Sequence, residues 1–265
     1  MNIYPIEIKN ISFGYGEKNV FENISLDISK GEMFFLMGRN GCGKSSLIDS
    51  ILNINKINSG EIKINGKRLE NYSPSELATK ISYVPQSHEK SFPYTVRQVV
   101  LMGRTVYSGA FGSYSQKDKE IVDNIMKKVG IYHLAERPYI LLSGGEIQMV
   151  MLARALAQDT NIIILDEPTA HLDFYNELLF MESILRLSKS EGKTIIIASH
   201  NPNHAFYAEK KGARVRVGLM ADGKIDIIDS PSKALTSKNI RLIYNINSQI
   251  LSSSYQNTII PLNTI

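Results

Sequence analysis

An octet of residues with the spacing of a phosphate-binding loop lies near the N-terminus. Residues 38–45 read GRNGCGKS, which fits the pattern G-x-x-x-x-G-K-[ST] between an apolar strand and a helix-forming run. In this context glycines let backbone N–H groups converge on phosphate oxygens, while Lys44 reaches the β- and γ-phosphates and Ser45 offers a hydroxyl to Mg²⁺. The alternative is a plain glycine turn. The predicted nucleotide-contacting set at this loop is Gly38, Arg39, Asn40, Gly41, Cys42, Gly43, Lys44, Ser45 and Ser46.

A buried strand that ends in two acids supplies a second candidate group. Residues 162–165 are IIIL, and Asp166 and Glu167 follow directly. Such a strand end can bring one carboxylate to Mg²⁺ and the second to an attacking water. We assign Asp166 to the metal and Glu167 to the general base. Without the phosphate loop, the same residues would be an ordinary capped strand.

A second glycine-backed helix N-terminus occurs further along the chain. Residues 142–146 read LSGGE, and a long apolar helix over 146–157 follows them. Ser143 is a favourable N-cap residue, and a helix N-terminus attracts anions. One nucleotide does not need two such cradles, and as an isolated pattern the segment is simply a helix cap.

These groups require a framework of strands and helices to position them. Residues 3–37 predict three or four short strands, and the runs 81–85, 162–166 and 194–199 predict further strands separated by helical segments. Residues 95–135 have helical periodicity, and turn signals predict hairpins over 60–69 and 213–229, the second at Asp222-Gly223. A short helix near residues 230–237 and a polar, Asn- and Ser-rich tail complete the chain. The simplest organisation is one compact α/β unit with a parallel sheet and an inserted helical lobe.

Composition excludes several other classes of protein. The chain has 265 residues, 43% hydrophobic and 21% charged, which excludes wholesale disorder and fibrous repeats. A net charge of +4 is too small to predict a polyanion-binding surface. Apolar runs are far shorter than the roughly 20 residues of a membrane-crossing helix. The single cysteine and an N-terminal segment unlike a signal peptide lead us to expect a reducing cytoplasm.

Taken together, the loop, the acidic strand end and LSGGE resemble the ATP-binding-cassette (ABC) ATPases. The resemblance implies ATP and Mg²⁺ as cofactors, with a P-loop NTPase core, an N-terminal antiparallel β region and an inserted helical subdomain near 88–157. It places a single ATPase domain at 3–245 and a C-terminal tail at 246–265. It further implies a head-to-tail dimer, most simply of two identical chains, in which Ser143, Gly144 and Gly145 contact the ATP held by the other subunit.

Four single residues match further positions of that family. Tyr15 matches an aromatic side chain that stacks on adenine, and Gln86 matches a glutamine that contacts Mg²⁺ and water. Asp173 matches an acid that crosses the dimer interface, and His200 a histidine that contacts the γ-phosphate. Their ordinary alternatives are a packed Tyr, a solvated Gln, a helix N-cap and a structural His. The resemblance thus assigns catalysis to Lys44, Gln86, Glu167 and His200, and Mg²⁺ binding to Ser45, Gln86 and Asp166.

Three segments resemble one branch of the family, the ATPase subunits of importers for iron chelates (siderophores), haem and cobalamin. They are residues 95–104, 199–205 and 230–244. This branch implies a polytopic membrane permease, as two copies or two subunits, an extracytoplasmic solute-binding protein, and a peripheral place on the cytoplasmic face of the membrane. We expect no nucleic-acid partner. The segment after Gln86 is a candidate exposed docking groove for a permease helix, with Met102 and Tyr107 as adaptable contacts. The alternative is that residues 95–107 are ordinary helical core.

Departures from the family pattern are modest, and other functions stay open. Ile147 and Met149 stand where relatives usually carry Arg, and Asn201 stands where Asp is usual. The alternatives are a soluble ABC-type ATPase of DNA repair or translation, an importer ATPase for a different solute, and a cassette that binds ATP without turnover. The last would lack a general base, so Glu167 and His200 argue against it.

Cys42 carries a separate expectation. It lies inside the phosphate loop, where N–H dipoles and Lys44 would lower the pKa of its thiol and favour the reactive thiolate. We therefore expect alkylation of Cys42 to block nucleotide binding and bound ATP to protect it. The alternative is a small unreactive loop residue.

Overall fold

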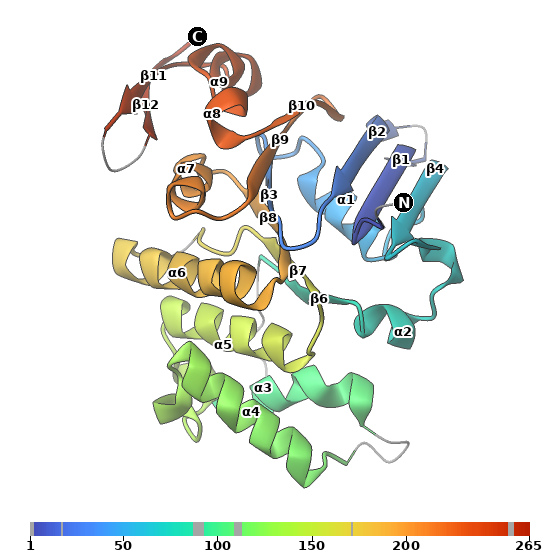
Figure 1. Cartoon of the computed structure of the whole chain (residues 1–265), viewed down its shortest axis with the longest axis vertical. Helices are drawn as coiled ribbons and strands as arrows, with labels where there is room; N and C mark the ends of the chain where they lie inside the picture. Colours follow the sequence, from blue (N-terminus) through green and yellow to red (C-terminus); the bar gives the residue numbers. More distant parts are fainter. Residues whose placement is uncertain (1–2, 17, 87–92, 109–112, 171, 254–256) are drawn as a thin grey trace. The chain divides into compact units, whose positions relative to one another are not determined.

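A computed structural model of the chain describes every residue except 1–2, 17, 87–92, 109–112, 171 and 254–256 (Figure 1). The chain forms two compact units. The first unit comprises Met1–Tyr72 and Leu185–Ile265, and the second unit comprises Ser73–Ile184. The boundary at residue 184 falls inside helix α6 (Phe174–Glu191). Each unit has its own strands and helices.

An antiparallel sheet opens the first unit. Strand β1 (Ile6–Tyr15) pairs with β2 (Lys18–Ile28) and β4 (Ser59–Ile64), and β4 also pairs with β5 (Lys67–Arg68), as Figure 1 shows for the three long strands. The register of β1 shifts between Ile8 and Ile11, and Asn10 has a φ of 49°. Such a bulge inserts one residue, so buried side chains on both sides of it keep facing the core. The predicted N-terminal antiparallel region is therefore confirmed.

Both predicted hairpin turns are present in the first unit. Asn65 and Gly66, between β4 and β5, have φ values of 49° and 81°. Asp222 and Gly223, between β9 (Val215–Ala221) and β10 (Lys224–Asp229), have values of 47° and 73°. Positive φ at both central residues matches the right-handed twist of the flanking strands, which is why Asn-Gly and Asp-Gly predict such turns.

Parallel strands form the centre of the first unit. Strand β3 (Met33–Met37) lies between β8 (Thr194–Ser199) and β9 and is parallel to both. All residues of β3 and β8 are buried, as expected for strands covered on both faces. Helices α1 (Lys44–Ile51) and α7 (Asn203–Lys210) follow β3 and β8 in the chain. Short 3₁₀ helix η1 (Leu69–Asn71) lies near the unit boundary.

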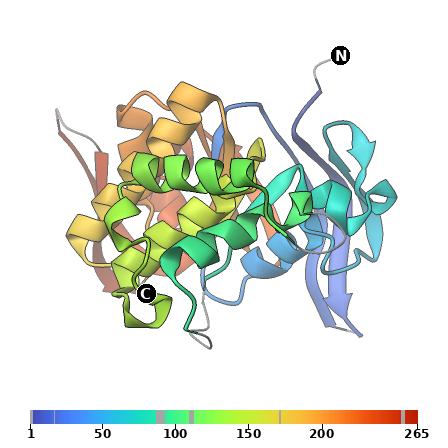
Figure 2. The ribbon, with the colours of Figure 1, turned by 90° about the horizontal axis from the view of Figure 1, so that it is seen from below.

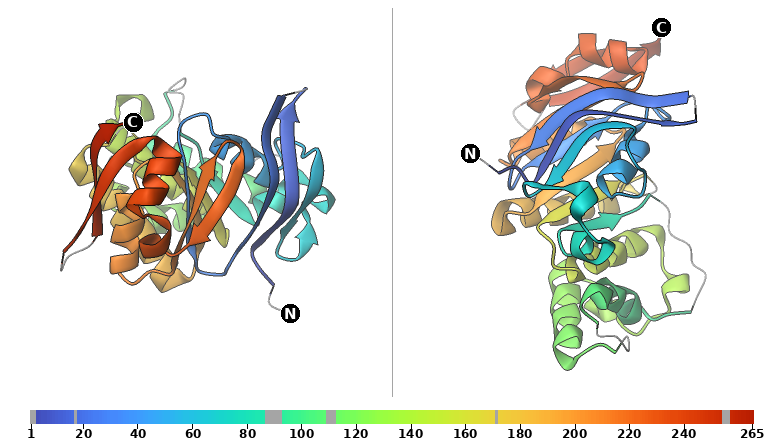
Figure 3. Two further views of the ribbon diagram at one scale, coloured as in Figure 1. Left: turned by 90° about the horizontal axis from the view of Figure 1, so that it is seen from above. Right: turned by 90° about the vertical axis from the view of Figure 1, so that its right-hand side faces the viewer.

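The C-terminal segment differs from the expected polar tail. After α8 (Pro231–Ala234) and α9 (Ser237–Tyr244), strands β11 (Ile246–Ser252) and β12 (Asn257–Thr264) form an antiparallel hairpin, shown in red in Figure 3. Strand β11 packs beside α9 and β12 beside α7. Ile259 is buried, and its N–H donates to Asn203 Oδ1 at 2.8 Å. A few alternating Ile residues among Asn and Ser suffice for a two-stranded hairpin once a helix covers one face.

Two parallel strands belong to the second unit. Strand β6 (Ile81–Val84) pairs with β7 (Ile162–Asp166) in the register Ile81–Ile162 to Val84–Leu165. All of β7 is buried. Helix α2 (Pro74–Ala78) precedes β6 and begins with a capping box at Ser73. The predicted strands at 81–85 and 162–166 are therefore confirmed, with their ends aligned.

Besides the first part of α6, the other elements that the structure describes in the second unit are helical. They are α3 (Val96–Leu101), η2 (Met102–Tyr107), α4 (Gln116–Val129), η3 (Tyr132–Leu134), η4 (Tyr139–Leu141) and α5 (Gly144–Ala157). Helix α5 is apolar on all sides and mostly buried, and α3 and α4 pack against it (Figure 2). Among the described residues, no helix combines the length and the apolarity needed to cross a bilayer.

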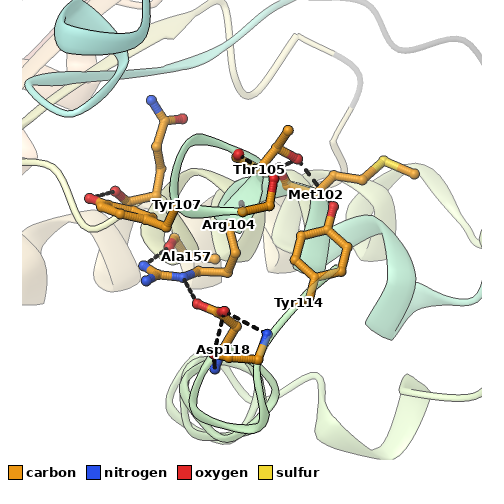
Figure 4. A network of polar contacts seen from close by, with 10 residues as sticks. Met102, Arg104, Thr105, Tyr107, Tyr114, Asp118 and Ala157 are labelled. Carbon is orange, nitrogen blue, oxygen red and sulfur yellow. Dashed lines mark hydrogen bonds and ion pairs between the residues drawn. The ribbon is translucent and has the colours of Figure 1, made fainter. Parts of the chain in front are cut away.

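A buried ion pair joins three helical segments of the second unit (Figure 4). Arg104 and Asp118 are each 7% exposed, and Arg104 Nε donates to Asp118 Oδ1 at 2.9 Å. Arg104 Nη1 also donates to the carbonyl oxygen of Ala157, at 2.8 Å. Asp118 is the third residue of α4 and accepts hydrogen bonds from Ser115, its N-cap. Hydrogen bonds from Ser115, and then from Arg104, hold the pKa of Asp118 below its usual range.

Candidate functional site

The phosphate loop leaves β3 and enters α1 through glycines that the backbone requires. Gly41 has a φ of 79° and Gly43 a φ of 110°, which place both in the left-handed region. A Cβ on Gly38 would lie 2.2 Å from the carbonyl oxygen of Met220, so a larger residue does not fit there. Arg39, Asn40 and Gly41 are exposed. The loop thus has the turn and the open face that a phosphate cradle needs.

Lys44 is held at the loop itself. It is 5% exposed, and Nζ donates to the carbonyl oxygens of Gly38 at 2.9 Å and Arg39 at 3.1 Å. Ser45, next in the chain, is exposed, and Ser46 is half-buried. A fixed ammonium beside converging N–H groups forms charge-assisted hydrogen bonds with an anion. The predicted phosphate-binding residues therefore lie together on one turn of the first unit.

Cys42 does not have the thiolate character expected from its position. Burial raises the pKa of its thiol above the usual value, and this effect outweighs the charge of Lys44 and the nearby backbone N–H groups, which lower it. The expectation of a lowered pKa is therefore wrong. The thiol lies in a half-buried part of the loop, where water cannot solvate a thiolate fully.

His200 leaves the sheet of the first unit at the same edge as the phosphate loop. Met37, the last residue of β3, lies opposite Ser199, the last residue of β8. Gly38 and His200 therefore follow neighbouring parallel strands, at the carboxyl edge where α/β folds bind ligands. Asn201 fixes the next turn, because its Oδ1 accepts from the first N–H of α7 at 3.1 Å. The departure from Asp at this position thus keeps an oxygen that accepts the N–H of Asn203.

Tyr15 lies at the end of β1 and is 63% exposed. The ring meets Phe13 edge to face, with centroids 4.9 Å apart, and its hydroxyl accepts a long contact from Asn55 Nδ2 at 3.5 Å. This exposure argues against the packing alternative. A ring anchored at one edge leaves a face on which a base can stack.

Gln86 and Glu167 meet in the second unit. Because Val84 pairs with Leu165, the residues that follow β6 and β7 emerge side by side, and Gln86 Nε2 donates to Glu167 Oε2 at 3.2 Å. Glu167 has a φ of 45°, which is uncommon for a residue other than glycine and costs roughly 1 kcal/mol. Asp166, at the end of β7, is 4% exposed. Sequence analysis predicted all three residues, and the strand register brings Gln86 to the acidic strand end.

Ser143 caps helix α5 through a reciprocal pair of hydrogen bonds. Glu146 N–H donates to Ser143 Oγ at 3.4 Å, and Ser143 N–H donates to Glu146 Oε2 at 2.8 Å. Arg137 Nη1 donates to the other oxygen of Glu146 at 3.1 Å. These contacts, led by the Ser143 backbone N–H, hold the pKa of Glu146 below its usual range. Ser143 and Gly144 are exposed, while Gly145 is buried.

Asp173 caps helix α6. Its Oδ1 accepts from the backbone N–H of Asn176 at 2.8 Å, the geometry of an N-cap three residues upstream. The capping alternative from the sequence is therefore confirmed for this side chain. Asp173 is also exposed, so the cap leaves a carboxylate oxygen accessible.

Residues 87–92 of the candidate docking segment lie outside the described residues, and its described part has a buried face and exposed aromatic side chains, Tyr107 among them. Val96 and Val100 are fully buried, so the helical-core alternative holds for that face. Tyr107 is 42% exposed, but its hydroxyl donates to the carbonyl oxygen of Gln158 at 3.0 Å and Arg104 stacks 4.0 Å from its ring centroid. Met102 is half-buried. Tyr107 is thus a fixed contact rather than the adaptable one expected.

Sequence reasoning missed the ion pair that holds this segment, and one of the caps. Arg104 and Asp118 are 14 residues apart in different segments, so no periodic signal links them. Glu146 belongs to the LSGGE motif, and its reciprocal bond to Ser143 is the second feature that sequence reasoning missed. The S-x-x-E spacing of a capping box would have revealed it.

The two units carry complementary chemistry. The first unit has an anion cradle with a fixed ammonium and a histidine at the same sheet edge. The second unit has two carboxylates and a glutamine at a strand end. A phosphate cradle and carboxylates that orient water are the parts that transfer of a phosphoryl group to water requires.

Comparison with known proteins agrees with this chemistry. Residues 21–170 match the family described as ABC transporter. An uncharacterised ABC transporter ATP-binding protein of Haemophilus influenzae is 34% identical over 97% of this chain and 95% of its own length. The iron(3+)-hydroxamate import ATP-binding protein FhuC of Bacillus subtilis is 30% identical over 95% and 92%. The hemin import ATP-binding protein HmuV of Thermobifida fusca is 34% identical over 96% and 86%.

Solved structures show the same fold. A chain from an inward-facing ABC transporter assigned to the metal-chelate type superposes with a TM-score of 0.84, at 28% identity over 98% of both chains. A dimeric bacterial ABC transporter cassette has a TM-score of 0.71, at 27% identity over 85% of this chain and 98% of its own. The chain belongs to the ABC transporter family, as an ATP-binding, ATP-hydrolysing subunit similar to those of iron-siderophore and haem importers.

Proposed function

We propose that this chain powers an importer for an iron chelate (siderophore), haem or cobalamin. It would bind the cytoplasmic face of the membrane beneath a polytopic permease, with an extracytoplasmic protein delivering the solute. The main structural support for ATP hydrolysis is the hydrogen bond between Gln86 and Glu167, at the acidic end of β7. The transport assignment is supported by the relatives that import iron(3+)-hydroxamate and hemin.

The proposed mechanism begins with ATP on the phosphate loop. Tyr15 would stack on adenine, while Lys44 and the loop N–H groups would bind the β- and γ-phosphates. Ser45, Gln86 and Asp166 offer hydroxyl, amide and carboxylate oxygens, the ligand types that Mg²⁺ prefers, and the ion would neutralise charge on the phosphates. These oxygen donors therefore fit Mg²⁺, which proteins usually bind through a few side chains together with the phosphates of the nucleotide.

Hydrolysis would then depend on orientation of a water. Glu167, fixed by Gln86, would accept a proton from the water that attacks the γ-phosphorus in line, and His200 would contact the transferred phosphoryl group. Because little covalent chemistry falls to the protein, positioning and electrostatic stabilisation would supply most of the rate enhancement.

A head-to-tail dimer would complete each site with Ser143, Gly144 and Gly145 of a second copy. Two observations support this arrangement. Ser143, Gly144 and Asp173 are exposed, so they are available to a partner. Beside Asp173, Phe174 is 90% exposed and Tyr175 is 74% exposed, an apolar pair of the kind that marks a surface covered by another chain. The solved dimeric cassette supports such pairing.

Affinity isolation of the chain from its native membranes in gentle detergent tests the transport role. We expect a polytopic permease to co-purify, and the isolated complex to hydrolyse ATP faster when a ferric siderophore, haem or cobalamin is supplied with its binding protein. Recovery of ribosomes, DNA or cytosolic proteins alone would overturn the importer and favour the soluble ABC-type ATPase. Stimulation by an unrelated solute would support the importer assignment but with a different transported solute.

A further inference from the structure

Asn176 on α6 lies directly against Gly145 on α5, within the second unit. A Cβ built on Gly145 would lie 2.4 Å from Cγ, 2.6 Å from Oδ1 and 2.8 Å from Nδ2 of Asn176. Real Cβ atoms essentially never approach other atoms this closely. The carboxamide of Asn176 therefore packs on the bare Cα of Gly145, and it fits there only because residue 145 has no side chain.

The side chain of Asn176 is also held from its other side. Nδ2 donates to Asp173 Oδ1 at 2.9 Å, and the same oxygen accepts the Asn176 backbone N–H at 2.8 Å. Rotation of the carboxamide away from Gly145 would break the first of these bonds. Asp173, Asn176 and Gly145 thus form a connected chain of contacts from the cap of α6 to the first turn of α5.

The first turn of α5 is held from two directions as a result. On one side, Ser143 and Glu146 cap each other. On the other side, Asn176 packs on Gly145. Ser143, the N-cap of α5, and Asp173, the N-cap of α6, are both exposed. The Gly145–Asn176 contact therefore connects the two helix turns that carry these residues.

We propose that Asn176 is a positioning residue that locks the N-terminal turns of α5 and α6 together, so that Ser143 and Asp173 meet the partner subunit as one rigid surface. This inference rests on the proposed function, because that function places Ser143 and Asp173 at the dimer interface. Asn176 itself acts through Gly145 and Asp173 and touches no substrate.

The chemistry of the carboxamide explains why this residue type suits the position. Asparagine is short and uncharged, and it offers a donor to Asp173. Aspartate would place a second carboxylate beside Asp173, and the two like charges would repel. Alanine would remove both the donor and the packed surface. Serine keeps a donor on a shorter side chain and is the conservative variant.

Steady-state kinetics of the full chain test the proposal. We expect N176A and N176D to lower kcat by about 10- to 100-fold, the scale of an error of about 1 Å in positioning. The Kd for ATP of the isolated chain should stay unchanged, because the phosphate loop belongs to the first unit. N176S should recover part of kcat. The matched control is N124A, which alters an exposed asparagine on α4 of the same unit.

A double-mutant cycle separates this role from any direct role of Gly145. G145A should lower kcat because the new Cβ displaces Asn176 from Asp173, and G145A/N176A should lose much less than the product of the two single effects. Wild-type kcat in both N176A and N176D would overturn the proposal, and so would effects of G145A and N176A that simply multiply. Failure of the proposed head-to-tail dimer is separate, because the unaltered chain would then show no ATP-dependent association. In that case the coupling of Gly145 and Asn176 in the free energy of unfolding still decides whether the contact locks the two helices.

Discussion

Gln86 Nε2 lies 3.2 Å from Glu167 Oε2, and this hydrogen bond joins the ends of two parallel strands. Glu167 follows β7, and Gln86 lies two residues after β6. The bond fixes a carboxylate whose own backbone is in the left-handed region, with a φ of 45°. A residue keeps a strained backbone only where the surrounding structure holds it in place. The hydrogen bond from Gln86 is such a contact, and it holds the proposed base in one orientation.

Replacement of Glu167 by glutamine should stop turnover while ATP still binds. The amide keeps an oxygen that can accept the Gln86 hydrogen bond, but it cannot take a proton from water. Loss of a general base costs typically 10²- to 10⁴-fold in rate, so we expect kcat of E167Q to fall by about that factor. Release of inorganic phosphate and the Kd for ATP are the measurements.

The control for this experiment is E120Q, which removes an exposed acid on α4. It should hydrolyse ATP like the unaltered chain. Near wild-type phosphate release by E167Q would show that another group accepts the proton, and the assignment of the general base would be wrong.

Lys44→Ala should abolish nucleotide binding and turnover without unfolding the chain. The substitution removes the donor to the carbonyl oxygens of Gly38 and Arg39, together with the charge that meets the phosphates. Because Arg39 is exposed, its carbonyl region can be solvated, and the thermal unfolding midpoint should fall only slightly. Equilibrium ATP binding and a melting curve test this. A folded K44A protein that retains most of its activity would contradict the proposed role of the loop.

The sequence predicted the strands and site residues where periodicity or spacing carries the signal. The all-apolar run before Asp166 predicts a buried strand. The spacing G-x-x-x-x-G-K-S predicts the glycine turn of a phosphate-binding loop. Long-range contacts have no such signal. The pairing of Asn176 with Gly145, and of Arg104 with Asp118, depends on which helix faces pack together.

Two expectations failed for physical reasons that a one-dimensional pattern does not contain. Residues 246–265 are polar enough to be read as a tail, yet Ile259 is buried and α7 holds β12 through Asn203. The pKa of Cys42 depends on how far the loop is desolvated, and this opposes the charge of Lys44. Burial by distant segments decided both outcomes.

Loss of either partner of the Arg104–Asp118 pair should destabilise the second unit. Breaking a buried ion pair leaves one charge without its partner and typically costs about 3–5 kcal/mol. We therefore expect R104M and D118A each to lower the free energy of unfolding strongly, and R104M/D118A to lose less than the sum. Urea denaturation measures all three. Additive losses would show that the two charges do not stabilise each other.

The same pair predicts loss of stability in acid. The pKa of Asp118 is lowered in the folded chain, so its ionised form contributes stability that is fully present above the unfolded value of about 3.9. That contribution is lost as pH falls below this value towards the folded pKa. The difference in unfolding free energy between the unaltered chain and D118N should therefore be large at neutral pH and shrink in acid. If this difference in unfolding free energy were the same at neutral and acidic pH, ionised Asp118 would not contribute the predicted stability.

Cys42 should react slowly with alkylating reagents at neutral pH. Burial raises the pKa of its thiol, so at pH 7–8 the thiolate fraction is smaller than that of a free cysteine, and the thiolate is the nucleophile. The rate should rise as pH increases through the raised pKa, and bound ATP should slow it further, because the residue lies in the phosphate loop. Mass spectrometry after timed iodoacetamide treatment measures the rate, with the same chain in denaturant as the reference for an exposed thiol. Alkylation of the folded chain as fast as the denatured chain would contradict the buried thiol, whereas modified protein that binds ATP with unchanged affinity would remove Cys42 from the nucleotide contacts.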